Sequence, residues 1–186
     1  AGIDATTASE GATTATRGSA VRGQKSGIGE KQGITNGKSM SVLGFPVDAY
    51  IPDTYLETPA LKFEIHKNLD SCRRLSDIAH LALSVRDRFG PLADPVARLF
   101  QVRAIRLRCA EIGIDRIDLQ DRQARLHLSG PLPPELARVS MPDLVHIQLD
   151  GSVLVLFAKI KFDQDSGLKF LCRLLSLDLA FLGRGF

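Results

Sequence analysis

The strongest constraint on the fold is a change of hydrophobic period at Gly113. Before this residue, apolar side chains recur every three or four positions in residues 61–72 and 76–89, as on one face of a helix. Residues 94–112 also predict a helix, which is apolar over most of its circumference. After Gly113, apolar and polar residues alternate, as on a strand with one buried face, in IDRIDLQ (114–120) and ARLHLS (124–129). Helices followed by strands predict an α+β domain.

Capping signals set the expected ends of the helices. Ser76 is the predicted N-cap of the second helix, and Asp94 that of the third, with Pro95 at its first position. Gly90 and Gly113 follow the last turns, where glycine readily takes the left-handed conformation. Ahead of the first helix, FPVDAYIPDTYL is expected to be extended, because proline biases the preceding residue away from helix.

The second half predicts a small sheet with a helix over it. VHIQLDGSVLVLFAKI indicates a hairpin that turns at Asp150-Gly151. The uninterrupted apolar run Val153–Phe157 is typical of a central strand covered on both faces. A short turn or helix at PPELARVS and a last helix over residues 164–182 complete the prediction: three N-terminal helices, then a mostly antiparallel sheet of about four strands covered by a C-terminal helix.

The predicted last helix has two apolar faces. One carries six residues from Leu168 to Leu182, and the other is a candidate docking stripe of Phe170, Leu174, Leu177 and Phe181. Either another element of the same domain covers the second face, or it is a surface for a partner.

Residues 1–44 differ in composition from the remainder. They are rich in Ala, Thr, Ser and Gly and lack apolar periodicity, so they predict a disordered tail or linker before a domain at 45–186. A transit peptide is the alternative interpretation, which would place the protein in a plastid. GITNGKS (33–39) resembles a phosphate-binding loop, but Gln32 stands where that motif needs glycine, and no strand-like run precedes it.

The sequence shows no recognisable catalytic or metal-binding motif. The three cysteines and four histidines are scattered, with neither C-x-x-C nor H-E-x-x-H spacing. We therefore expect no metal, no cofactor and no enzymatic activity of this chain. The longest apolar run, VLVLFA, is too short to cross a bilayer, so we expect a cytosolic protein without a membrane partner.

Three stretches together resemble a known family. VDAYIPD (47–53), DRFGP (87–91) and RLRCAEIGIDRIDL (106–119) are similar, in order and in register, to the C-terminal domain of the bacterial transcription-repair coupling factor. The resemblance extends over roughly residues 46–175.

This resemblance implies a regulatory role in the bacterial cytosol. Members of the family are large ATP-dependent DNA translocases that remove stalled RNA polymerase from damaged DNA and recruit excision-repair proteins. Their C-terminal domain is a noncatalytic, autoinhibitory clamp on an N-terminal repair-recruitment module. The expected direct partner is that module, in the same or a companion polypeptide, with RNA polymerase, excision-repair proteins and DNA as indirect partners.

The resemblance also implies a contact edge at the end of the second helix. Family members present an acidic residue, two spacers and then Asp-Arg there; Asp87 and Arg88 match this pattern, whereas Ser84 replaces the acid. A solvated helix end is the alternative interpretation of these charges.

A nucleic-acid-binding module is the competing function. It would use the basic tail and Arg98, Arg103, Arg106 and Arg108, although these arginines are spread around the third helix. The net charge of only +3 permits such a partner without favouring it.

Overall fold

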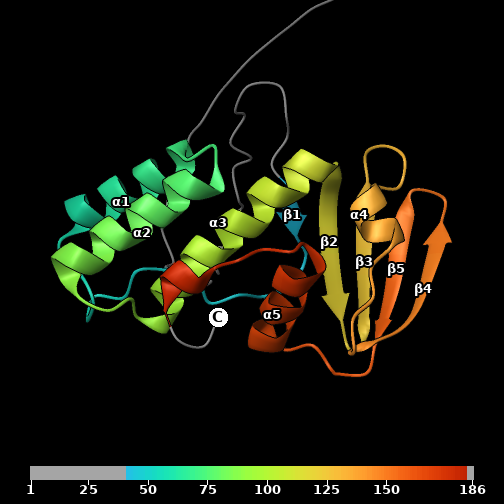
Figure 1. Cartoon of the computed structure of the whole chain (residues 1–186). Helices are drawn as coiled ribbons and strands as arrows, with labels where there is room; N and C mark the ends of the chain where they lie inside the picture. The colour runs from blue at the N-terminus through green and yellow to red at the C-terminus, as the bar shows by residue number, and fades with distance from the viewer. Residues whose placement is uncertain (1–40, 184–186) are drawn as a thin grey trace, which may run out of the picture. The chain divides into compact units, whose positions relative to one another are not determined.

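The computed structural model describes residues 41–183 as three helices beside a five-stranded sheet (Figure 1). The helices are α1 (Pro59–Ser71), α2 (Leu75–Phe89) and α3 (Asp94–Ile112). The strands are β1 (Val42–Leu43), β2 (Ile114–Gln120), β3 (Gln123–Leu128), β4 (Leu144–Asp150) and β5 (Val153–Ala158). The fold is completed by the short helix α4 (Pro134–Ala137), helix α5 (Gln164–Leu174) and the 3₁₀ turn η1 (Ala180–Leu182). The α+β prediction is confirmed.

The sheet has the order β1-β2-β3-β5-β4. Every pair is antiparallel except β1 with β2, which run parallel with Val42 opposite Arg116. The β4–β5 hairpin turns through Gly151, at φ +57°, as the Asp-Gly pair predicts. The fifth strand, β1, was not predicted from the sequence.

The predicted tail boundary at residue 44 is too late. Val42 and Leu43 belong to the sheet, and the buried Ser41 hydroxyl donates to the carbonyl oxygen of Ile114 at 2.6 Å. The other residues of the predicted tail, 1–40, lie outside the part of the chain that the structure describes, and so does GITNGKS.

Two hydrophobic cores share helix α3. The first, the sheet core, lies between the sheet and helices α3 and α5, and includes Ile105 and Cys109 of α3. The second, the helical core, joins α1, α2 and α3 to the extended segment, and includes Phe100 and Ala104 of α3. Because α3 contributes to both cores, it is apolar over most of its circumference.

The helix caps differ from the prediction. Helix α2 begins at Leu75 rather than after Ser76, because the Asp77 carboxylate accepts the backbone N–H groups of Arg73 and Arg74 at 3.0 Å each. These hydrogen bonds to the charged form lower the pKa of Asp77. Helix α3 begins at Asp94 itself, with Ala93 as its N-cap and no side-chain cap.

The prediction of a long last helix is wrong. Helix α5 ends at Leu174, and Ser176 takes φ +52°, a left-handed conformation that breaks the helical path. The chain then continues through Leu179 to η1, and both Leu179 and Leu182 are buried in the helical core. The segment after α5 therefore belongs to the fold at least as far as Leu182.

Within residues 41–183 the sheet is covered on one face only, contrary to the prediction for Val153–Phe157. Leu154, Leu156 and Ala158 of β5 are buried against the helices, whereas Val153, Val155 and Phe157 are only partly buried on the opposite, open face. A continuous apolar run is thus compatible with a half-covered strand, because every second residue needs burial.

Candidate protein-interaction site

The residues predicted for the contact edge come together on helix α2. Ser84, Asp87 and Arg88 are all exposed, and their spacing of three and four places them on one helical face. The opposite face, with Ile78, Ala82 and Val85, is buried in the helical core. Packing therefore orients the charged face of α2 outward.

The end of α2 is held in place by its neighbours. Gly90 follows it at φ +87°, and the Tyr55 hydroxyl donates to the Gly90 carbonyl oxygen at 3.2 Å. The Arg88 guanidinium lies 5.0 Å from the centre of the Phe89 ring. Tyr50, the other tyrosine of the extended segment, is exposed. These interactions fix where Asp87 and Arg88 emerge.

An apolar residue beside the charged pair was missed from the sequence. Leu83, 39% exposed, lies one position before Ser84 and four before Asp87. Its helical position, off the apolar stripe that faces the core, is the signal that could have identified it. The face is therefore mixed, as protein interfaces commonly are.

The predicted docking stripe does not form. Phe170 and Leu174 are 2% and 3% exposed and belong to the sheet core. Leu177 and Phe181 are partly buried and lie beyond the end of α5. The domain itself covers this second apolar face, which was the alternative interpretation.

The arginines of α3 serve mainly as structural links. Arg98 makes a two-pronged ion pair with Asp165 of α5, at 2.9 and 3.4 Å. Arg103 is buried and donates to the carbonyl oxygens of Asp70 and Cys72, at 2.8 Å each, and its burial lowers its pKa. Arg108 pairs with Glu111 at 3.1 Å. Together with half-buried Arg106, they do not form an exposed phosphate-binding stripe.

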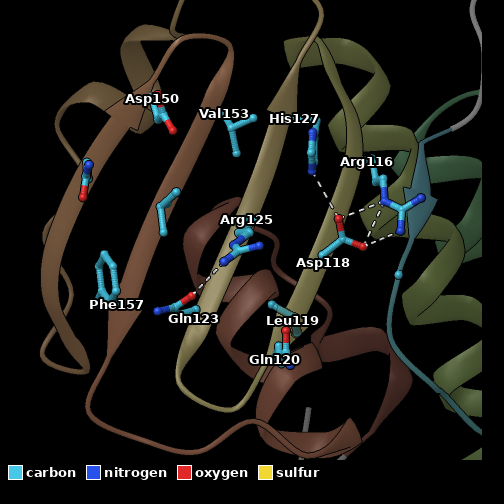
Figure 2. Close-up of a pocket in the computed structure, with 13 residues that line it drawn as sticks. Arg116, Asp118, Leu119, Gln120, Gln123, Arg125, His127, Asp150, Val153 and Phe157 are labelled. Carbon is cyan, nitrogen blue, oxygen red and sulfur yellow. Dashed lines mark hydrogen bonds and ion pairs between the residues drawn. The ribbon is translucent and has the colours of Figure 1, made fainter.

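A second polar cluster lies on the open face of the sheet (Figure 2). Arg116 donates three hydrogen bonds, of 2.8–2.9 Å, to the Asp118 carboxylate, and His127 Nε2 lies 3.2 Å from the same carboxylate. The hydrogen bonds from Arg116 hold the pKa of Asp118 below its usual value. A shallow depression of about 1010 Å³ surrounds the cluster.

The described residues offer little for catalysis. Among residues 41–183, no group of three or more His, Cys, Asp or Glu side chains is placed to hold a metal ion. Burial raises the pKa of the Cys109 thiol to about 12 and also raises the pKa of Cys172, so neither provides a thiolate near neutral pH. Within the same residues, no helix is long and apolar enough to span a membrane.

The two cores and the sheet define the class of the protein: it is a small α+β domain in which a three-helix unit continues into a mostly antiparallel sheet. The sequence profile of the TRCF domain matches residues 45–138, half of the chain, and the chain belongs to that family.

Curated relatives of this chain include transcription-repair-coupling factors from several bacteria. The Mycobacterium bovis protein is 29% identical over 99 residues, which is 53% of this chain and 8% of the relative. The Haemophilus influenzae protein is 24% identical over 132 residues, 69% of this chain and 12% of the relative. The chain therefore spans about a tenth of the length of these relatives.

A solved structure has the same fold. The crystal structure of the C-terminal domain of a transcription-repair coupling factor superposes with a TM-score of 0.63 at 23% identity. The match covers 77% of this chain and 92% of that domain.

Proposed function

We propose that this chain is the regulatory C-terminal domain of a transcription-repair coupling factor and acts by protein contact rather than by catalysis. Membership of the TRCF domain family supports this proposal. In this proposal the whole protein is an ATP-dependent DNA translocase that removes stalled RNA polymerase and recruits excision repair. The domain covers the recruitment face of the N-terminal module and so acts as an autoinhibitory clamp.

The exposed face of α2 is the observation that carries the proposal. Asp87 and Arg88 project from a helix whose other side is buried, and neither has an ion pair within residues 41–183. Free charges of opposite sign, one on each residue, can pair with complementary charges on a partner without first breaking internal ion pairs. Leu83 adds apolar area next to them.

The test measures binding of the full chain to the N-terminal recruitment module of a coupling factor by titration calorimetry. We expect the double charge reversal Asp87→Lys with Arg88→Glu to weaken binding at least tenfold. The matched control reverses two exposed charges away from α2, Asp115→Lys with Arg138→Glu, and should bind like the wild type.

The two possible failures have different meanings. Equal binding of the α2 variant and the wild type would show that the contact lies elsewhere on the domain. Absence of binding by the wild type, at low as well as high salt, would contradict the clamp itself.

A further inference from the structure

The outer edge of strand β4 is unpaired within the described residues. Strand β4 is the last in the order β1-β2-β3-β5-β4, and β5 is its only strand neighbour (Figure 1). A free edge presents a row of backbone N–H and C=O groups that another strand can bind. The opposite edge of the sheet ends in the two-residue strand β1, which is too short to offer a comparable row.

The sequence of β4 does little to protect this edge. Soluble proteins block edge pairing with lysine, proline or bulges. LVHIQLD contains no lysine, arginine or proline, and Val145 and Leu149 are 63% and 51% exposed. The strand has one irregularity, a register shift between Leu144 and His146, which leaves residues 146–150 regular.

The alternation of backbone hydrogen bonds in the β4–β5 hairpin identifies which backbone groups of β4 point toward its free edge. Asp150 and Val153 face each other across the two-residue turn of the hairpin. Successive residues in an antiparallel ladder direct their backbone groups to opposite neighbours. Ile147 and Leu149 should therefore direct their N–H and C=O groups away from β5.

We propose that β4 pairs antiparallel with β4 of a second copy of this chain, about a two-fold axis at Gln148. This register places Ile147 opposite the second copy's Leu149, so the backbone groups on the free side meet. It also places each His146 opposite an Asp150, while Gln148 faces itself. The strand is thus complementary to itself in charge and in apolar character, which favours a second copy over an unrelated strand.

The paired strands would join two five-stranded sheets into one continuous sheet. His146, Gln148 and Asp150 lie on the open face, opposite Phe157, Val155 and Val153 of β5. Ile147 and Leu149 lie on the covered face, opposite Leu156 and Leu154. Leu149 would thereby lose part of its exposure. An overlap of five residues per strand is small, so the dimer should be weak and concentration-dependent.

Disulfide trapping tests both pairing and register. In a non-hydrogen-bonded antiparallel pair the Cα atoms lie about 4.5 Å apart, within the range that a disulfide accepts. Gln148→Cys at 100 µM should therefore form a disulfide-linked dimer at least tenfold faster than Gln120→Cys, an exposed glutamine on β2. Equal rates for the two variants would overturn the proposed register.

Charge exchange gives a second test that needs no new cysteine. His146→Asp alone places two carboxylates opposite each other, and Asp150→Lys alone places a lysine opposite a histidine, so each variant should dimerise at least fivefold more weakly than the wild type. A mixture of the two variants gives a carboxylate–lysine pair at one position and the wild-type His146–Asp150 pair at the other, and should form heterodimers.

Sedimentation velocity of the full chain between 5 and 500 µM measures these associations. Leu149→Lys, at an exposed position, should remain monomeric throughout. The proposal fails if the wild type is monomeric at 500 µM, or if the mixed variants associate no better than either variant alone. Wild-type binding only to extended peptides of other proteins would likewise assign the edge to a different partner.

Discussion

Gly44 lies directly against the Asp118 carboxylate. A Cβ atom at Gly44 would be 1.8 Å from Asp118 Oδ1, far inside contact distance. Asp118 has little room to move, because Arg116 and His127 bind the same carboxylate from β2 and β3. The Gly44 amide also donates to the Ile117 carbonyl oxygen at 2.7 Å, which holds the backbone close to β2. Glycine is thus required here for close approach rather than for its backbone angles.

Gly44→Ala should destabilise the domain by about 1–3 kcal/mol, the usual cost of overpacking. Urea denaturation followed by circular dichroism measures the change. Gly130→Ala is the matched control, because nothing lies within 4 Å of its added methyl group. Equal stabilities of the two variants would contradict the packing argument.

Asp118 should make stability depend on pH in the acid range. Its pKa is lower in the folded protein than in the unfolded chain, so its contribution is fully present above the unfolded value of about 4 and is lost as the pH falls through the folded value. Asp118→Asn should therefore be less stable than the wild type at pH 6, and the difference should shrink as the pH falls below about 4.

Replacing the hydrogen-bond donor provides the control for this prediction. Arg116 is the main cause of the lowered pKa of Asp118, so in an Arg116→Met background the effect of Asp118→Asn should depend much less on pH. An unchanged pH profile in that background would show that Arg116 is not the cause.

Leu182→Ala should cost about 2–4 kcal/mol, because Leu182 is 4% exposed and contributes to the helical core. Thermal or urea unfolding measures the loss. Phe63→Ala removes a larger side chain that is 71% exposed, and should change stability by less than about 0.5 kcal/mol. If Leu182→Ala is as mild as Phe63→Ala, the segment after α5 does not stabilise the fold.

Ser84→Glu should strengthen the proposed contact between α2 and the recruitment module. It places an acid on the same face as Asp87 and Arg88, as the family pattern implies, and an exposed ion pair adds about 0.2–1 kcal/mol. The expected gain in affinity is about 1.4-fold to fivefold at low salt. Ser84→Gln controls for side-chain size, and an equal gain from glutamine would argue against a charge effect.

The sequence determined most of the secondary structure. The period change at Gly113, the two glycines after α2 and α3, and Asp150-Gly151 predicted the helices and the hairpin, because these signals depend on local backbone preferences. The face shared by Asp87 and Arg88 with Ser84 also follows from helical spacing alone. The motifs quoted for the family indicated the same domain that the profile later matched.

Tertiary structure decided what each apolar face contacts. Periodicity over residues 164–182 predicted one helix, yet Ser176 breaks it so that Leu171 enters the sheet core while Leu179 enters the helical core. Strand β1 was missed because two residues carry no periodic signal, and its pairing with β2 joins segments more than seventy positions apart. Arg103 likewise contacts carbonyl oxygens of a different helix and loop. Local sequence sets backbone preferences, whereas burial depends on contacts between distant segments, which only the folded chain brings together.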